Sequence, residues 1–355
     1  MTAGAPAEPV TSAAGTRVDL GRVFALLLLI GALAPGLWWR SEWVPLTRTG
    51  TVTFLQITDA AARRGEGEVQ LAGVWRLTSR DSRFGGYSAM VVRADGKLRA
   101  YSDSGLWLEF DAPDNPTGID PRFGDIRGGG GKYSNDVEAA AYDPETGITW
   151  LALEFVHAIR RISHETVEVA PPAMAHFRQN GGAEAMVRLP DGRFLLLAES
   201  AEPLSPRRRT GLLFATDPVI DDRATAFDFE PPLGYDPSDA ALLPDGRVLI
   251  LLRALSFTNF PPFAARLVVA DPADIEAGKP WSWREVAHLS GVVPPDNYEG
   301  LAVVPGESGL VLWLISDANQ AVLLQRTLLV KLVWNESDAP RNEAPPQVRR
   351  PQPPS

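Results

Sequence analysis

A strand–turn–strand motif occurs five times between residues 85 and 317, and this repetition restricts the fold more than any other feature of the sequence. Each copy leads from a short apolar run through a turn such as Pro190-Asp191-Gly192 into a second apolar run. Proline presets one backbone angle of the turn, and glycine takes the left-handed position that closes a hairpin. The copies start near residues 88, 138, 184, 239 and 299, which are 50, 46, 55 and 60 residues apart. This period is typical of the four-stranded blades of a β-propeller.

The length of the repetitive body predicts the number of blades. Residues 43–334 number about 290, which at about 50 residues per blade gives six. The sixth blade lacks a copy of the motif, so we expect Val69–Thr78 and Leu323–Trp334 to build it from both ends and to close the ring. A β-sandwich is the competing architecture, but a sandwich does not require a repeat of this period. The predicted fold is therefore an all-β, six-bladed β-propeller closed by N- and C-terminal strands and preceded by one N-terminal hydrophobic helix.

Charge and cysteine content exclude several classes of function. The chain has 44 acidic and 34 basic residues and a net charge of −10, which disfavours nucleic acid as a partner. Cysteine is absent, so disulfides, thiolate metal sites and a cysteine nucleophile are excluded. The four histidines lack zinc-site spacing, and no Gly-x-Ser-x-Gly elbow of a serine esterase occurs. Hard cations held by oxygen ligands remain possible.

The segment before the body has the pattern of a membrane anchor or a signal peptide. Val23–Trp39 contains no charged residue and lies between Arg22 and Arg40. Its 17 residues are at the short limit for a spanning helix. We favour an uncleaved anchor, with a cleaved signal as the alternative. Either one would place the body outside the cytoplasm, in the periplasm and anchored to the inner membrane, or secreted.

The other end of the chain, from Pro340 to Ser355, is rich in proline and lacks apolar periodicity, which is typical of a disordered tail. The predicted organisation therefore has three parts: an N-terminal tail with the anchor or signal segment (1–42), the propeller domain (43–334) and a disordered Pro-rich tail (335–355).

Acidic residues recur at the two ends of the hairpins, with Ser88 in the first repeat and Arg253 in the fourth as exceptions. In an antiparallel hairpin, the start of the first strand and the end of the second are neighbours. The repeats therefore predict side-by-side carboxylates, and the first strands of all blades bring these ends to one mouth of the central channel. We call the predicted group the acidic mouth: Asp103, Glu138, Glu154, Glu184, Glu199, Asp239, Glu299 and Asp317.

Converging carboxylates require a cation or an ordered set of donors. We therefore predict a Ca²⁺ site with six ligands, namely Asp103, Glu138, Glu154, Glu199, Asp239 and Asp317. Glu184 and Glu299 are the predicted catalytic carboxylates, with His157 as a further candidate base. The alternative is that the carboxylates only bind loop N–H groups and fix the blades, and that His157 is structural.

Basic residues near the predicted mouth are candidates for substrate binding. Arg253 stands in the fourth repeat where the other repeats carry an acid, so it is either an internal counter-ion or an anion clamp. Arg207 and Arg209 belong to a basic cluster after Glu199. This cluster is either a solvated loop or an edge that binds phosphate.

The order of these motifs resembles the phytase-like β-propeller family. The resemblance rests on Gly182-Ala183-Glu184-Ala185, on Asn297-Tyr298-Glu299-Gly300-Leu301 and on Trp150-Leu151-Ala152-Leu153-Glu154, and it covers about residues 70–334. It implies a propeller with an acidic central face and, by analogy with propeller phytases, Ca²⁺-assisted hydrolysis of phosphate esters. Bacterial members are described as having esterase-like activity. The lysines and arginines with which phytases bind phosphate have no residue-by-residue match here, and Ser88 and Arg253 interrupt the acidic ring.

These observations lead to one main functional prediction and two alternatives. The main prediction is a metal-assisted hydrolase of phosphate esters or related esters, acting outside the cytoplasm on a small molecule. One alternative is a Ca²⁺-dependent lactonase or carboxylesterase on the same scaffold, and the other is a non-catalytic envelope binding or scaffold protein. We expect a monomer that contacts the membrane through its N-terminal segment.

Overall fold

The computed structural model describes residues 47–58, 65–126, 134–178, 181–202, 205–256, 262–307, 309–318 and 326–335, together with Gly21 and Phe24. Contacts divide the chain into two units, Met1–Trp43 and Val44–Ser355, and the fold reported below is that of the second unit. Apart from Gly21 and Phe24, the predicted anchor segment lies outside the described residues, and so does the predicted tail beyond residue 335. None of the described residues belongs to a helix that is long and apolar enough to cross a membrane.

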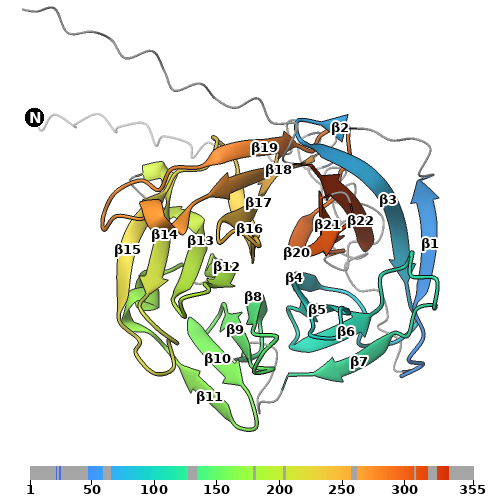
Figure 1. The fold of residues 1–355 in the computed structure, drawn as a ribbon, viewed down its shortest axis with the longest axis horizontal. Helices are drawn as coiled ribbons and strands as arrows, with labels where there is room; N and C mark the ends of the chain where they lie inside the picture. The colour runs from blue at the N-terminus through green and yellow to red at the C-terminus, as the bar shows by residue number, and fades with distance from the viewer. Residues whose placement is uncertain are drawn as a thin grey trace, which may run out of the picture. The chain divides into compact units, whose positions relative to one another are not determined.

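The described strands of the second unit form five antiparallel sheets around a central channel (Figure 1). The first sheet contains β4 (Tyr87–Val92), β5 (Leu98–Ser102), β6 (Leu106–Phe110) and β7 (Arg122–Asp125). The second contains β8 (Val137–Tyr142), β9 (Thr149–Leu153), β10 (Ala158–Ile162) and β11 (Thr166–Val169). The third contains β12 (Ala183–Arg188), β13 (Phe194–Glu202), β14 (Ser205–Phe214) and β15 (Ala224–Phe229). The fourth contains β16 (Asp236–Leu242), β17 (Val248–Leu255), β18 (Phe263–Ala270) and β19 (Arg284–His288).

The fifth sheet joins the two ends of the propeller. Its order is β20 (Tyr298–Gly306), β21 (Gly309–Ser316), β22 (Leu328–Trp334), β3 (Val69–Thr78) and β1 (Thr53–Thr58), with β2 (Gly65–Glu66) paired to β3. The C-terminal strand β22 pairs with the N-terminal strand β3 from Leu328 opposite Arg76 to Trp334 opposite Val69. A propeller closed by strands from both ends is thus the observed fold.

The predicted number of six blades is wrong, because the described residues form five. The segments expected to build a sixth blade, β3 and β22, instead extend the sheet that begins at β20. The fifth blade therefore has six strands, and its extra strands account for the length that division by the repeat period had assigned to a separate blade. From residue 47 to residue 335, the described helical structure consists of short 3-10 turns, including η2 (Pro172–His176) and η3 (Pro272–Asp274).

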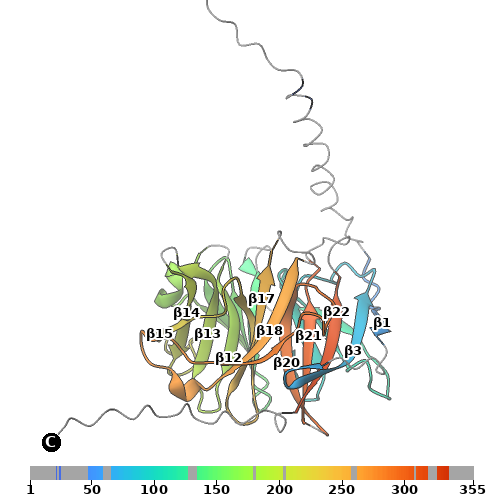
Figure 2. The same cartoon turned by 90° about the horizontal axis from the view of Figure 1, so that it is seen from above.

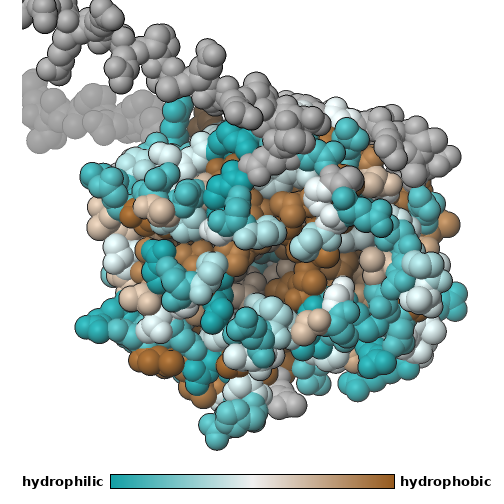
Figure 3. Space-filling model, viewed as in Figure 1, coloured by the Kyte–Doolittle hydropathy of each residue, from teal (hydrophilic) through white to brown (hydrophobic). Residues whose placement is uncertain are grey.

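Each of the five apolar clusters of the core lies between two neighbouring blades. One cluster joins blades 1 and 2 and includes Ala89 and Leu151, and another joins blades 4 and 5 and includes Leu251 and Leu314. Blade strands are therefore buried on both faces, which explains continuous apolar runs such as Val248–Leu252, where every residue is 0% exposed. The strands run through the thickness of the ring (Figure 2), so one end of each blade meets each face of the propeller. On the face drawn in Figure 3, apolar residues surround the central hollow and polar residues lie further out.

Candidate functional site

Each innermost strand contains a β-bulge at the same position near its start. The strand register shifts there in all five blades, and the extra residues are Ser88, Glu138, Glu184, Ser238 and Glu299. A bulge redirects the side chain of the extra residue. Three of the five bulged residues are glutamates at the start of a channel-lining strand, so the bulges set the positions of these acids.

The bulges change the alignment of the fourth repeat by one residue. Asp239 was aligned with Glu184 and Glu299 in the sequence, but the equivalent of these residues is Ser238. Asp239 follows the bulge, so its side chain does not occupy the position that Glu184 and Glu299 have in their blades. The ring of bulged residues therefore contains two serines and three glutamates.

In four blades, the residues just beyond the last pair between the first and second strands approach the same end of the channel. Their backbone N–H groups donate to the carbonyl oxygen two residues before the bulge, in four pairs: Asp103 to Gly86 at 2.8 Å, Glu154 to Asp136 at 2.9 Å, Glu199 to Gly182 at 3.1 Å and Asp317 to Asn297 at 2.8 Å. In the fourth blade the pair is Arg253 opposite Asp236. The hairpins thus bring the acids at the start of the first strands and those at the end of the second strands to one end of the channel. The bulge displaces their register by one residue.

Three carboxylates of blade 2 form the group best suited to a metal ion. Oxygen atoms of Asp136, Glu138 and Glu154 all lie within 4.8 Å of one another. Two of the three, Glu138 and Glu154, are among the predicted ligands. Asp136 was not predicted, although its position two residues before a bulged acid was a usable signal. The set consists of carboxylate oxygens only, which fits a hard cation such as Ca²⁺, Mg²⁺ or Mn²⁺.

The carboxylates of this triad repel one another in a partly dehydrated place. Burial raises the pKa of Glu138 well above its ordinary value, and Glu184, Glu299, Glu154 and Asp136 add to the shift by their charge. Burial also raises the pKa of Glu154 to about 7, with Asp136 as the next contributor, while N–H groups of Gly182 and Gly181 oppose the shift. A cation bound here would relieve the repulsion, because it replaces protons on the same oxygen atoms.

A second part of the mouth is held together by Arg253. Its Nη1 donates to Glu299 Oε1 at 2.5 Å and to Asn297 Oδ1 at 2.8 Å, and its Nη2 donates to Glu199 Oε1. The Asn297 amide also donates to Glu299 Oε1 at 2.7 Å. Arg253 therefore acts as a counter-ion that links the third, fourth and fifth blades.

Glu184 and Glu299 differ in their environments. Glu184 is 6% exposed, and burial followed by the charge of Glu199 raises its pKa well above the ordinary value, although Arg253 opposes this shift. Burial also raises the pKa of Glu299, against the effects of Arg253 and Asn297. Both carboxylates therefore have raised pKa values, and Glu299 is in addition held by its hydrogen bonds to Arg253 and Asn297.

The remaining predicted acids occupy separate places. Asp103 packs against Gly86, where a Cβ would lie 2.5 Å from Asp103 Oδ1, and its charge contributes to the raised pKa of Glu299. Asp317 is 5% exposed at the end of the fifth hairpin. Neither residue belongs to the triad of Asp136, Glu138 and Glu154.

Asp239 lies inside the channel and crosses to two other blades. Its Oδ2 accepts hydrogen bonds from Leu301 N at 2.7 Å and Met90 N at 3.4 Å, and its Oδ1 accepts one from Ala240 N at 2.8 Å. Burial raises its pKa well above the ordinary value, whereas the three N–H donors oppose the shift. The carboxylate satisfies backbone groups of innermost strands.

A separate cavity of about 250 Å³ lies among the innermost strands and is lined by residues such as Met90, Ala140 and Leu301.

The other predicted basic residues have different degrees of exposure. Arg209 is 5% exposed, and its Nε donates to Asp236 Oδ1 at 2.6 Å, so its charge is committed to an internal pair. Arg207 is exposed on β14. His157 lies in the turn between β9 and β10, where its backbone N–H donates to the carbonyl oxygen of Glu154 at 3.0 Å. Its ring Nδ1 is buried without a hydrogen-bond partner. Burial lowers the pKa of His157 and favours the neutral ring.

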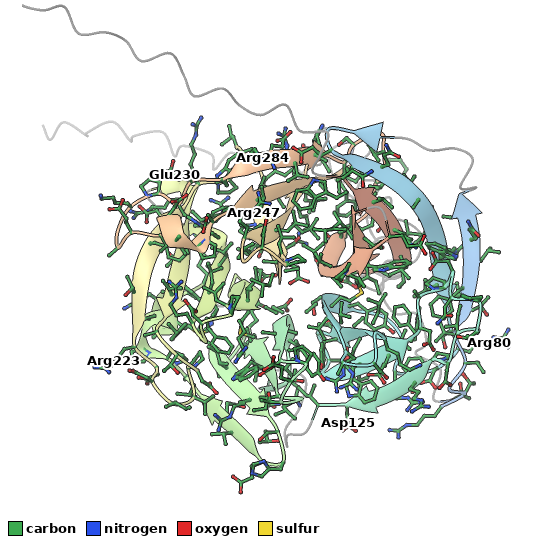
Figure 4. The ribbon with its side chains drawn as sticks, in the orientation of Figure 1. Arg80, Asp125, Arg223, Glu230, Arg247 and Arg284 are labelled. Atoms are coloured by element: carbon green, nitrogen blue, oxygen red, sulfur yellow. The ribbon has the colours of Figure 1, made fainter. Side chains whose placement is uncertain are left out.

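Several charged residues outside the mouth lie at the rim of the ring, among them Arg80, Arg223 and Arg284 (Figure 4). Of the labelled side chains, Arg223 pairs with Asp221, Arg247 with Asp245 and Arg284 with Glu68. The exposed pair of Arg223 with Asp221 contributes little to stability and contrasts with the buried charges of the channel.

The fold and the mouth together define a β-propeller protein with a carboxylate-rich channel mouth. A family model described as "Phytase-like: Esterase-like activity of phytase" matches residues 82–320. The chain belongs to this phytase-like family. The family name implies esterase-like activity without specifying a reaction. Among curated proteins, no match to the chain is significant.

Solved structures similar to this chain include several enzymes. The Xanthomonas campestris gluconolactonase XC5397 is 13% identical, with a TM-score of 0.42, and the match covers 80% of this chain and 86% of that one. Virginiamycin B lyase from Staphylococcus aureus is 13% identical, with a TM-score of 0.38, and the match covers 68% and 80%. A thermostable family-43 glycoside hydrolase is 11% identical, with a TM-score of 0.45 and coverage of 76% and 97%. At these values the similarities carry no inference about the reaction.

Proposed function

We propose that this protein is a metal-dependent ester hydrolase whose metal ion is held by Asp136, Glu138 and Glu154. The observation that carries the proposal is the approach of three carboxylates to within 4.8 Å at a channel mouth. Burial, followed by the charges of neighbouring carboxylates, raises the pKa values of Glu138 and Glu154, and a cation that neutralises these carboxylates would offset both effects. Membership of a family named for esterase-like activity supports the same reading.

A bound divalent cation such as Ca²⁺ would polarise an ester oxygen and make a water molecule more acidic. Glu184 is the proposed proton-transfer residue, because it is buried near Glu138 and has a raised pKa. Glu299 orients Arg253 through the 2.5 Å hydrogen bond. His157, neutral and next to Glu154 in the chain fold, is a candidate second base.

Neutral carboxylic esters or lactones fit the described mouth better than phosphate esters. Arg253 and Arg209 are each bound to carboxylates, so neither guanidinium is available to a phosphate without losing a partner. A phosphate dianion would also approach several carboxylates of like charge. A neutral ester carbonyl avoids this repulsion and requires only one polarising cation. Lactone or carboxylic-ester hydrolysis is therefore the substrate class that we propose, with phosphate esters as the competing class.

A thermal melt of the full chain tests the metal site. A ligand that binds only the folded state raises the midpoint of unfolding. We expect Ca²⁺, added after a chelator, to raise the midpoint by several degrees in the natural sequence and not in Glu138→Gln. Glu145→Gln is the matched control, because Glu145 is exposed in a turn of the same blade. No shift with Ca²⁺, Mg²⁺ or Mn²⁺ would refute the metal site and favour a non-catalytic binding or scaffold protein.

Activity is then measured on a panel of lactones, carboxylic esters and phosphate esters. We expect the first two classes to be hydrolysed and Glu184→Gln to lose at least about 100-fold in kcat, the low end of the contribution of a proton-transfer group. A preference for phosphate esters would overturn the substrate class. Full activity in both Glu138→Gln and Glu184→Gln would overturn the site.

The cellular setting is a separate part of the proposal and rests on the sequence alone. We propose an extracytoplasmic monomer attached to the membrane through the apolar run Val23–Trp39. A reporter enzyme that is active only outside the cytoplasm, fused after residue 335, tests the location. Size-exclusion chromatography with light scattering tests the monomeric state.

A further inference from the structure

A second cavity opens on the same face of the ring as the acidic mouth. Its volume is about 470 Å³, within the usual range for small-molecule pockets. Much of its wall is apolar and comes from Phe263, Ala264, Leu289, Val293, Pro294 and Pro295. The wall is formed by the start of β18 and by the segment that connects β19 to β20.

This pocket is directly next to the mouth. Ala265, which lines the pocket, is the cross-strand neighbour of Arg253 in the pairing of β17 with β18. On the other side, Asp296 and Tyr298 line the pocket, and Asn297 between them binds Arg253 in the mouth. Residues that line the pocket are therefore immediate neighbours of Arg253 and Asn297, which belong to the mouth.

The wall of the pocket is held rigidly by hydrogen bonds. Leu289 N donates to Ala265 O at 2.9 Å, and Leu289 O accepts from both Val292 N and Val293 N at 3.1 Å. Tyr298 Oη donates to Pro294 O at 2.7 Å. A preformed wall binds a ligand without the entropy loss that ordering a loop would require.

The charged groups of the pocket wall have partners within the protein. Asp296 forms an ion pair with Arg326, with 3.4 Å between Asp296 Oδ2 and Arg326 Nε. His288 Nε2 lies 3.2 Å from Tyr235 Oη and 3.3 Å from Ser290 Oγ. Arg266 pairs with Glu285 and stacks on the Tyr235 ring, 4.7 Å from its centre. Ser290 is exposed, so its hydroxyl can exchange a hydrogen bond with a ligand. The pocket thus suits a neutral apolar group that carries at most one polar atom.

We propose that this pocket binds the medium-length alkyl chain of the ester or lactone on which the mouth acts. The inference rests on the proposed function and specifies its substrate class. If a methylene takes about the volume of a water molecule, ~30 Å³, eight carbons need about 240 Å³, or about half of the cavity. The chain lies against the apolar wall, and the ester group extends past Asn297 toward the mouth.

Hydrolysis of 4-nitrophenyl acetate and 4-nitrophenyl octanoate by the full chain tests the proposal. Burial of a methylene improves binding about fourfold, so burial of only half of the six additional methylenes of the octanoate already favours it by about 60-fold in kcat/KM. Ser290→Trp places a large ring at the exposed edge of the pocket. We expect this variant to lower kcat/KM for the octanoate at least tenfold more than kcat/KM for the acetate. Ala277→Trp, at an exposed position after η3, is the control and keeps the preference.

Direct binding separates this inference from the proposed function. 2-Octanone has a carbonyl group and a six-carbon chain and cannot be hydrolysed. By calorimetry we expect it to bind the natural sequence and the metal-site variant Glu138→Gln alike, and to bind Ser290→Trp at least tenfold more weakly. Binding without esterase activity would support the pocket while refuting the function. Esterase activity without chain-length preference and without 2-octanone binding would overturn the pocket alone.

Discussion

Replacement of Asp239 tests whether a buried carboxylate holds the innermost strands together. Asp239 is 1% exposed and accepts hydrogen bonds from Leu301 N at 2.7 Å and from Met90 N at 3.4 Å, both from other blades. Asp239→Ala leaves the buried Leu301 N–H without its acceptor, which costs about 1–3 kcal/mol. The longer bond to Met90 adds little. We therefore expect the free energy of unfolding to fall by about 2 kcal/mol.

Denaturant unfolding followed by tryptophan fluorescence measures this loss, and the midpoint of a thermal melt gives a second estimate. A loss of 1 kcal/mol lowers the Tm of a domain of 150–250 residues by about 2–4 °C, so a drop of about 4 °C is expected for this larger unit. Asp239→Asn keeps one acceptor oxygen for Leu301 but turns an N–H₂ group toward Ala240 N, so about half of the loss is expected. Glu276→Ala, which breaks an exposed pair with Lys279, is the control and changes stability by less than about 0.5 kcal/mol.

Two results would refute this reasoning. If Asp239→Ala were as stable as the natural sequence, the Leu301 N–H would not depend on the carboxylate. If Asp239→Asn were as damaging as Asp239→Ala, the negative charge rather than the acceptor geometry would matter, and a cation near Asp239 would become the better explanation. The response of Tm to Ca²⁺ distinguishes the latter case, because we expect Asp239→Asn to keep that response.

Three further predictions concern the mouth and the channel. The pKa of Glu154 is raised to about 7, so the metal-free folded state keeps a proton that the unfolded chain releases near pH 4.5. The contribution of this group to stability is therefore greatest at low pH and falls as the pH rises to about 7. Melts in chelator should therefore give a higher Tm at pH 5 than at pH 7.5, with a smaller difference in Glu154→Gln, and an equal difference would contradict this origin. Gly300→Ala should lose about 1–3 kcal/mol in denaturant unfolding, because its Cβ would lie 2.5 Å from Ile315 Cγ2; no loss would mean that the channel adjusts freely. Arg253→Met removes the counter-ion of Glu199 and Glu299 and should lower the free energy of unfolding by up to about 3 kcal/mol. The loss should be larger at pH 8 than at pH 5, because the carboxylates can be neutralised by protons at low pH. A loss that does not depend on pH would show that packing alone is involved.

The sequence was sufficient for features that depend on local chain geometry. Turns such as Pro190-Asp191-Gly192 determine the hairpins, and the repeat period indicates blades, so the propeller and its closure by β3 and β22 follow from the sequence. The acids at both hairpin ends, for example Glu138 and Glu154, approach each other because the turn sets the register of the two strands to within a residue. These features require no knowledge of contacts between blades.

The tertiary structure decided what depends on distances between blades and on single-residue register. Whether β3 and β22 form a separate blade or extend an existing one depends on whether a strand edge of a neighbouring sheet is free for pairing. Here β22 pairs with β21, so the propeller has five blades rather than six in the described residues. A bulge moves the equivalent position from Asp239 to Ser238, a shift that a repeat alignment does not detect. The place of Asp136 in the triad and the commitment of Arg253 to two glutamates depend on side-chain directions around the channel, where ångström differences separate a metal ligand from a structural carboxylate.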